Sequence, residues 1–212
     1  MSLNDFPTTV QIDGCTLCTL HVNQFEPRAH RTIQQPPLST LQHDGKFYRV
    51  YDELSESQYS VQCGFLSGYA SRYWDHPDQF PDLIRPELRF DRRSVKRHLD
   101  WGNREPTKYI SVYSSVEKAR MECLRRCNDP YFQGARRGQV RVSVIKGLEV
   151  MQNERVFLTS TQELLRTGLL HIGDEYVSRA EWLVLDRIPA SCVEARGTAE
   201  QFLEFCDLLF KN

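Results

Sequence analysis

The chain has 212 residues, of which 40% are hydrophobic and 26% charged, and its net charge is -1. These values are typical of a folded protein and exclude a disordered tail, and the length suits one domain with one substantial core. The near-zero charge argues against strong non-specific attraction to nucleic acid. We interpret one local basic run as the solvated face of a helix, formed by Arg92, Arg93, Lys96 and Arg97.

Targeting signals and cysteines bear on the compartment. No stretch approaches the roughly 20 apolar residues of a membrane-spanning helix, and the first residues lack the basic start and apolar run of a signal peptide. Seven cysteines without a dense framework favour reduced thiols, so we expect an intracellular protein of the cytoplasm or nucleus. Cys15, Cys18 and His21 could begin a zinc site, but His30 lies beyond a proline, and we expect no metal.

The N-terminal part differs in composition from the rest of the chain. Residues 1–40 are polar and end in a stretch rich in proline and small polar residues, which is typical of a linker. Apolar residues on both sides of Asp13 and Gly14 indicate a possible hairpin. We therefore predict an N-terminal extension over residues 1–40 and a main domain over residues 41–212.

The first half of that domain begins with a strand. The aromatic and β-branched run Lys46–Tyr51 predicts it, and a polar loop over residues 52–62 follows. Residues 69–108 carry several prolines and predict irregular structure, with a short helix over residues 94–101. Alternation over residues 109–113 predicts the next strand.

The second half alternates helices and strands. Ser115 is suited to cap a helix with an apolar face, and residues 140–150 alternate as a strand. Ser160 with Glu163, and later Thr198 with Gln201, predict capping boxes that start two further helices, the first closed by Gly168. Residues 181–185 predict a strand between them. The order of elements is that of an α+β domain with peripheral helices.

Three segments can carry chemistry together. They are the strand pair Tyr48-Arg49, the strand segment around Ser111, and the strand that begins at Glu181. In this order they resemble the Arg, Ser and Glu motifs of the ADP-ribosyltransferase superfamily, in particular the branch of the cholera and heat-labile enterotoxin A chains. The resemblance covers roughly residues 46 to 194.

Further residues extend this resemblance. The acidic, Ser-rich loop after Arg49 ends in Gly64 and Phe65, as in those toxins, and Ile188-Pro189 follows the strand of Glu181. The run Glu181–Leu185 is also similar to a motif of poly-ADP-ribose polymerases. The same three blocks, with the segment from His98 to Trp101, resemble an uncharacterised fungal family.

The resemblance implies a split β-sheet core that binds NAD and cleaves its nicotinamide–ribose bond. Breaking that bond places positive charge on the ribose, so a fixed carboxylate, Glu181, would stabilise the transition state. Arg49 would hold phosphate and ribose oxygens, and Ser111 would orient Glu181. Tyr113 would stack on the nicotinamide, and Gly64 and Phe65 complete the expected cofactor-binding set.

One position departs from the pattern. Arginine-modifying relatives carry a second Glu two residues before the catalytic one, and this position on the acceptor side is Arg179 here. The sequence therefore predicts a mono-ADP-ribosyltransferase or NAD glycohydrolase whose acceptor is a protein side chain, nucleic acid or water. The alternative is a catalytically inactive NAD- or ADP-ribose-binding or protein-interaction domain on the same fold. An RNA 2'-phosphotransferase is a third hypothesis, which the near-neutral charge disfavours.

Overall fold

A computed structural model describes residues 11–12, 15–16, 45–73, 90–100, 103, 105–128, 139–153, 156–171 and 180–210. In the N-terminal part, at the position of the predicted hairpin, β1 (Gln11–Ile12) pairs antiparallel with β2 (Cys15–Thr16). The predicted linker before residue 41 lies outside the described residues.

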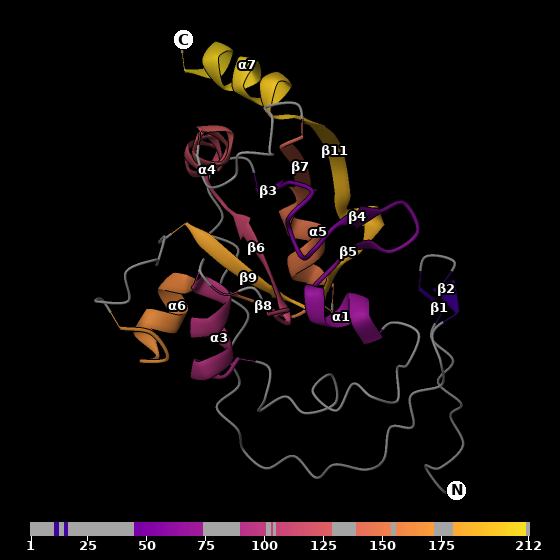
Figure 1. The fold of residues 1–212 in the computed structure, drawn as a ribbon, viewed down its shortest axis with the longest axis vertical. Helices are drawn as coiled ribbons and strands as arrows, with labels where there is room; N and C mark the ends of the chain where they lie inside the picture. Colours follow the sequence, from indigo (N-terminus) through magenta and orange to yellow (C-terminus); the bar gives the residue numbers. More distant parts are fainter. Residues whose placement is uncertain are drawn as a thin grey trace, which may run out of the picture.

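Two antiparallel sheets form the main fold (Figure 1). The larger sheet has the strand order β11 (Val193–Thr198), β7 (Arg141–Lys146), β3 (Lys46–Tyr51), β6 (Tyr109–Tyr113), β9 (Glu181–Leu185) and β8 (Leu158–Ser160). The smaller one has the order β10 (Arg187–Ile188), β5 (Gly64–Leu66) and β4 (Tyr59–Ser60). With helices around them, they confirm the α+β class.

The helices surround the larger sheet. They are α1 (Gly68–Tyr73), α3 (Arg92–Leu99), α4 (Val116–Asn128), α5 (Gly147–Gln152), α6 (Thr161–Arg166), the 3-10 helix η5 (Ala190–Cys192) and α7 (Ala199–Leu209). Figure 1 shows α4 and α7 at one end of the sheet and α3 and α6 together at the other. In the described part of the chain, no helix has the length and apolar character that crossing a membrane requires.

Local capping explains where several helices begin. The Thr198 side chain accepts from the Gln201 N–H and the Gln201 side chain accepts from the Thr198 N–H, so the predicted box of α7 is complete. At α6 the Ser160 hydroxyl accepts from the Glu163 N–H, whereas the Glu163 carboxylate pairs with Arg166. The start of both helices was therefore predictable from the sequence.

Three boundary predictions were wrong. The strand predicted over residues 140–150 ends at Lys146, because α5 begins at Gly147 and buries Gly147, Val150 and Met151 at helical spacing. The helix predicted over residues 94–101 begins at Arg92, since Asp91 caps it by accepting from the Ser94 N–H. The segments predicted as loop or irregular contain β4 and α1.

Alternation along the strands divides the core between the two faces of the larger sheet. One face carries Ile110 and Val112 of β6 with Phe47 of β3, and they pack with Phe65 and Ile188 of the smaller sheet. The opposite face carries two clusters. Tyr48, Tyr113 and Val142 pack against α4 and α7, whereas Tyr109, Leu183 and Leu185 pack against α3 and α6.

The larger sheet is loosely joined at its centre. β3 and β6 share one register pair, Tyr48 with Tyr113, whereas β3 pairs with β7 over six positions and β6 with β9 over five. Arg49, the residue after Tyr48, lies at this point and donates through Nη1 to the Ser111 carbonyl at 2.8 Å. A side chain therefore bridges the two strands where their backbone pairing stops.

Candidate functional site

Ser111 and Glu181 meet on one face of the larger sheet. β6 and β9 are antiparallel, with Tyr113 opposite Glu181 and Ser111 opposite Leu183, so Ser111 and Glu181 are diagonal neighbours. The Ser111 hydroxyl hydrogen-bonds to the Glu181 carboxyl. This polar pair lies between the apolar cluster under α4 and α7 and the one under α3 and α6. The predicted contact of these two residues is therefore present.

His98 extends the pair from α3. Its Nδ1 lies 2.6 Å from the Thr107 hydroxyl and its Nε2 lies 2.8 Å from the Ser111 hydroxyl. Burial, with the nearby Arg49 charge, lowers the pKa of His98 to about 3, so the ring is neutral. Because Ser111 donates to the Glu181 carboxylate, its oxygen accepts from Nε2–H, and Nδ1 then accepts from Thr107. Each donor in this chain points toward Glu181.

Glu181 is a buried carboxyl with a perturbed pKa. Its exposed fraction is 6%, and burial raises its pKa to about 7, against the opposing effect of the Ser111 hydrogen bond. The charge of Glu122 adds to the rise and that of Arg126 reduces it. Near neutral pH, Glu181 is thus poised between its protonated and ionised forms, as is common for carboxyl groups of functional sites.

Arg49 is a buried cation held by carbonyl groups. Its exposed fraction is 6%, Nη1 donates to the Ser111 carbonyl and Nη2 donates to the Ser57 carbonyl at 3.1 Å. Burial, with the Arg126 charge, lowers its pKa to about 10, so the guanidinium stays charged at neutral pH. Its Nε is buried without a hydrogen-bond partner, and no carboxylate of the described residues forms an ion pair with it.

Arg49, His98, Ser111 and Glu181 form one cluster, and the other predicted site residues differ in their positions relative to it. Phe65 lies under the guanidinium of Arg49, 5.2 Å from ring centre to Cζ. Gly64 has φ of +77°, and a Cβ there would collide with the Ile188 carbonyl, so the close approach of β5 and β10 requires glycine. Tyr113 packs in the cluster beneath α4. Arg179 lies outside the described residues, and the cofactor roles of Gly64, Phe65 and Tyr113 stay predictions.

A network of ion pairs on α4 acts electrostatically on Tyr113. Arg126 of α4 donates to Asp52 at 2.9 Å and to Glu122 at 2.7 Å, and Arg125 pairs with Glu122 at 2.8 Å. Burial opposes ionisation of Glu122, but the hydrogen bonds and charges of both arginines outweigh it and lower its pKa. Burial, followed by the charges of Glu181 and Glu122, raises the pKa of Tyr113, so its hydroxyl stays protonated.

Comparison with protein-family models shows the family of this chain. The model of a domain of unknown function, DUF7587, matches residues 42–202. The chain belongs to this family. The matched span of the DUF7587 domain contains Arg49, His98, Ser111 and Glu181. Searches of curated proteins and of solved structures give no significant match.

The DUF7587 domain also has an open cleft elsewhere. Its volume is about 650 Å³, and its lining residues come from β3, β4, β7, β11 and α7 and from the segments beside them. Arg49, His98, Ser111 and Glu181 are not among them. The perturbed carboxyl of Glu181 and the buried cation of Arg49 both hydrogen-bond to Ser111, outside the cleft, so the chemistry is assigned to these residues and not to the cleft. Among the described residues, no group of three or more His, Cys, Asp or Glu side chains could hold a metal ion.

The sequence indicated His98 only as part of a recurring segment and did not assign it to the site. A signal was present, because His98 falls three residues after Val95 and beside Leu99, both buried in α3. Although Ser111 and His98 are in contact, a histidine pKa of about 3 makes a weak general base. The arrangement instead suits a carboxyl group whose position and ionisation are controlled by a chain of donors.

Proposed function

We propose that this protein consumes NAD by cleaving its nicotinamide–ribose bond and transfers the ADP-ribosyl group to a side chain, a nucleic acid or water. One observation carries the proposal. The Ser111 hydroxyl hydrogen-bonds to the Glu181 carboxyl, and the Ser111 carbonyl accepts from the buried cation Arg49, which pairs with no carboxylate among the described residues. An anion and a cation that are held separately suit a substrate carrying both charges.

Glu181 would act on the ribose. The bond from the ribose carbon to the nicotinamide nitrogen breaks, its electron pair leaves with nicotinamide, and the sugar becomes positively charged. A carboxylate fixed beside the sugar stabilises that charge more than it stabilises bound NAD. The positive charge of the nicotinamide ring would favour the ionised form of Glu181, whose pKa is about 7 without ligand. The acceptor then bonds to the ribose carbon and releases a proton to solvent.

Arg49 would attract the diphosphate of NAD. Two of its five N–H groups donate to the carbonyls of Ser111 and Ser57, which fixes the guanidinium, and its Nε–H is buried without a partner. A fixed guanidinium loses little freedom when it binds phosphate oxygens, and its charge then acquires a counter-charge. Ser111 and His98 are positioning residues in this proposal because they act through Glu181 and Arg49.

The proposal is tested by incubating the protein with NAD and measuring free nicotinamide. We expect release in the wild type and a loss of about 100-fold or more in Glu181→Gln, which keeps the size of the side chain but removes its charge. Glu194→Gln is a matched control, since Glu194 is exposed and pairs with Lys46 at the surface. Equal release by Glu181→Gln and wild type, with both proteins folded, would disprove the mechanism.

A second candidate is a catalytically inactive domain that binds NAD or ADP-ribose, or another protein, on the same fold. It is favoured by the low exposure of Glu181 and Arg49, 6% each, which limits the access of a substrate. Calorimetric titration with NAD and with ADP-ribose separates the two. Binding of either ligand without nicotinamide release supports the second candidate, and steady release excludes it.

A further inference from the structure

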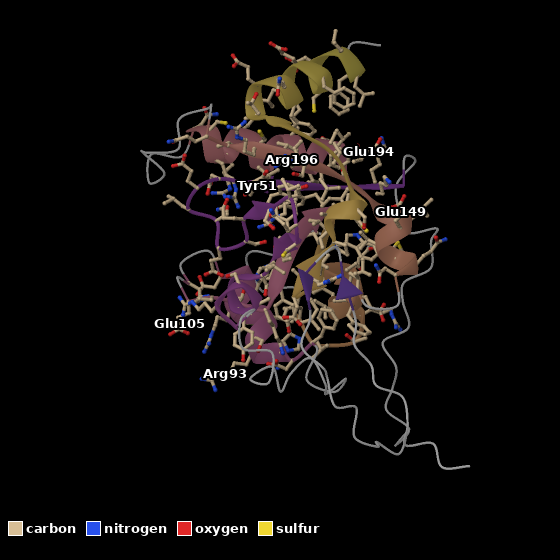
Figure 2. The ribbon with its side chains drawn as sticks, turned by 90° about the vertical axis from the view of Figure 1, so that its right-hand side faces the viewer. Tyr51, Arg93, Glu105, Glu149, Glu194 and Arg196 are labelled. Atoms are coloured by element: carbon tan, nitrogen blue, oxygen red, sulfur yellow. The ribbon has the colours of Figure 1, made fainter. Side chains whose placement is uncertain are left out.

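The open cleft is built on the face of β3, β7 and β11 that carries Arg49. Tyr51 of β3 lies opposite Arg141 of β7, which in turn lies opposite Thr198 of β11. Arg196, two residues before Thr198, projects from the same face as Arg141. Figure 2 shows Tyr51 and Arg196 near each other in the upper part of the molecule. The cleft is completed by Asp52, Glu53, Gln58, Tyr59, Gln139, Gly197 and Gln201.

Two guanidinium groups supply the positive charge of the cleft. Arg141 and Arg196 are both exposed, and neither forms an ion pair with a described residue. The guanidinium of Arg196 stacks on the ring of Tyr59 at 3.8 Å, which restricts its plane. Diagonal residues on neighbouring strands are about 7–8 Å apart at their Cα atoms, a spacing at which two long side chains can converge on one ligand.

The negative charges of the cleft oppose these arginines only in part. Asp52 is occupied, because its Oδ2 accepts from Arg126 at 2.9 Å and its Oδ1 accepts from the Leu54 N–H and the Ser55 hydroxyl, each at 3.0 Å. Glu53 is exposed and accepts a long hydrogen bond of 3.4 Å from Gln139 at the rim. Two guanidinium groups therefore face one unneutralised carboxylate, which favours an anionic ligand.

Uncharged groups and size narrow the class of ligand. Tyr51 contributes a phenol, and the Gln201 Oε1 accepts from the Thr198 N–H, which leaves the amide N–H groups of Gln201 to donate. Gln58 donates its amide nitrogen to the carbonyls of Asp52 and Ser55, which leaves its oxygen to accept. A volume of about 650 Å³ lies in the range of about 300–1,000 Å³ that small-molecule sites occupy, and exceeds the size of a bare phosphate ion.

From these features we infer that the cleft binds a phosphate-bearing small molecule, with Arg141 and Arg196 on the phosphate and the amide and phenol groups on a polar remainder. A guanidinium presents paired donors that match phosphate oxygens, which is the reason to assign the phosphate to the arginines. The phosphate can belong to a nucleotide or to a sugar phosphate. This inference does not depend on NAD cleavage, since no residue of the Glu181 cluster lines the cleft.

The test is calorimetric titration of the full chain with AMP, ribose 5-phosphate and adenosine. We expect saturable binding of both phosphorylated probes and at least tenfold weaker binding of adenosine, because a charged hydrogen-bonded contact contributes about that factor or more. Tighter binding of AMP than of ribose 5-phosphate would identify a nucleotide, and equal binding a sugar phosphate. Equal binding of AMP and adenosine, or no saturable binding of any probe, would overturn the inference.

Substitutions of the cleft residues test whether AMP binds in the cleft. Arg141→Gln and Arg196→Gln should each weaken AMP binding about tenfold or more, and Arg196→Lys should weaken it less, because the charge is kept and the fork is lost. Glu53→Gln should strengthen binding a few-fold by removing the opposing charge. Arg93→Gln is the matched control, an exposed arginine on α3 far from the cleft in Figure 2. An equal loss in Arg93→Gln would show non-specific attraction and overturn the assignment.

AMP could also reach Arg49, so Arg49→Ala is titrated in parallel. In Arg49→Ala, the part of AMP binding that depends on Arg141 and Arg196 should remain, and a loss of AMP binding confined to Arg49→Ala would contradict the assignment. The calorimetric titration measures AMP binding without any cleavage of NAD. A protein that binds AMP in the cleft but releases no nicotinamide would sustain this inference while the proposed function fails.

Discussion

Two arginines of this domain, Arg126 and the buried Arg49, are held in opposite ways. Arg126 donates to Asp52 and Glu122, and these charges overcome burial and raise its pKa above the ordinary value. Arg49 donates to two backbone carbonyls, and burial lowers its pKa to about 10. Both side chains contact the segment that follows β3, Arg126 at Asp52 and Arg49 at Ser57.

This difference distinguishes an arginine whose charge is neutralised within the fold from one whose charge can bind a ligand. A cation with two buried carboxylate partners is satisfied by its own fold, so removing it leaves those partners uncompensated. A buried cation with only carbonyl partners has dipoles around it but no counter-charge, and an anionic ligand can supply one. We therefore expect Arg126 to contribute to stability and Arg49 to contribute to binding.

The largest expected effect is on the stability side. Arg126→Gln should lower the free energy of unfolding by about 3 kcal/mol, because buried Asp52 then loses its ion-pair partner and buried Glu122 loses one of its two arginine partners. Denaturant titration measures this loss. Arg125→Gln is the matched control, because Arg125 also pairs with Glu122 but its side chain is more exposed, at 28% against 21% for Arg126, and it does not pair with Asp52. Equal losses in both variants would contradict the structural role of Arg126.

Glu181 should show the opposite behaviour, a cost to stability at neutral and alkaline pH. Its folded pKa of about 7 lies above the ordinary value of 4.5, so its contribution is complete below pH 4.5 and is lost as pH rises through 7. Glu181→Gln stays uncharged at every pH. Relative to wild type, the variant should therefore gain about 2 kcal/mol in the free energy of unfolding between pH 5 and pH 8. A difference that does not vary with pH would show that the pKa of Glu181 is ordinary.

The sequence indicated a role for Glu181, but it did not indicate one for Arg126 and its partner Glu122. The strands of Arg49, Ser111 and Glu181 were predictable from local sequence, and their order suggested that they belong together. Glu122 was not assigned to any site, although it falls three residues after Ala119 and beside Cys123, both buried in α4. Its partners Arg125 and Arg126 lie three and four residues further along the same helix, but only the tertiary structure shows that Arg126 also pairs with Asp52.

Two further features, the end of the strand predicted over residues 140–150 and the open cleft, could not be predicted from the sequence. The strand predicted over residues 140–150 was too long because Leu148 and Val150 continue its apolar alternation, whereas α5 leaves Leu148 exposed and buries Val150 and Met151. The cleft was not predictable, since Tyr51, Arg141 and Arg196 come together only through the pairing of β3, β7 and β11. Long-range strand order is set by packing and is not visible in local patterns.

For Arg49, the expected effect is on the affinity for NAD. Arg49→Ala should weaken NAD affinity by about tenfold or more, because a charged contact to the diphosphate is lost. Calorimetric titration on Glu181→Gln and on the Glu181→Gln, Arg49→Ala double variant measures affinity without turnover. The melting temperature of each preparation shows whether the fold is intact. Unchanged affinity in a folded double variant would remove Arg49 from the site.

The smallest expected effect belongs to His98, which acts on Glu181 only through Ser111. In the wild type, kcat/KM for NAD should rise with pH through a midpoint near 7, since the ionised carboxyl is the active form. His98→Leu removes the donor that orients the Ser111 hydroxyl, so the pKa of Glu181 and the midpoint should rise by roughly half a pH unit or more, lowering the rate at pH 7 about two- to fivefold.

His98→Gln is the matched control because its amide N–H can still donate to Ser111, and it should restore most of the wild-type midpoint. A histidine that serves only to fill space between α3 and β6 would behave differently. Both variants would then lower the melting temperature and leave the midpoint near 7, because packing affects the amount of folded protein and not the ionisation of Glu181. Measuring the pH profile and the melting temperature on the same preparations therefore decides whether the contact of 2.8 Å between His98 and Ser111 has a role in the reaction.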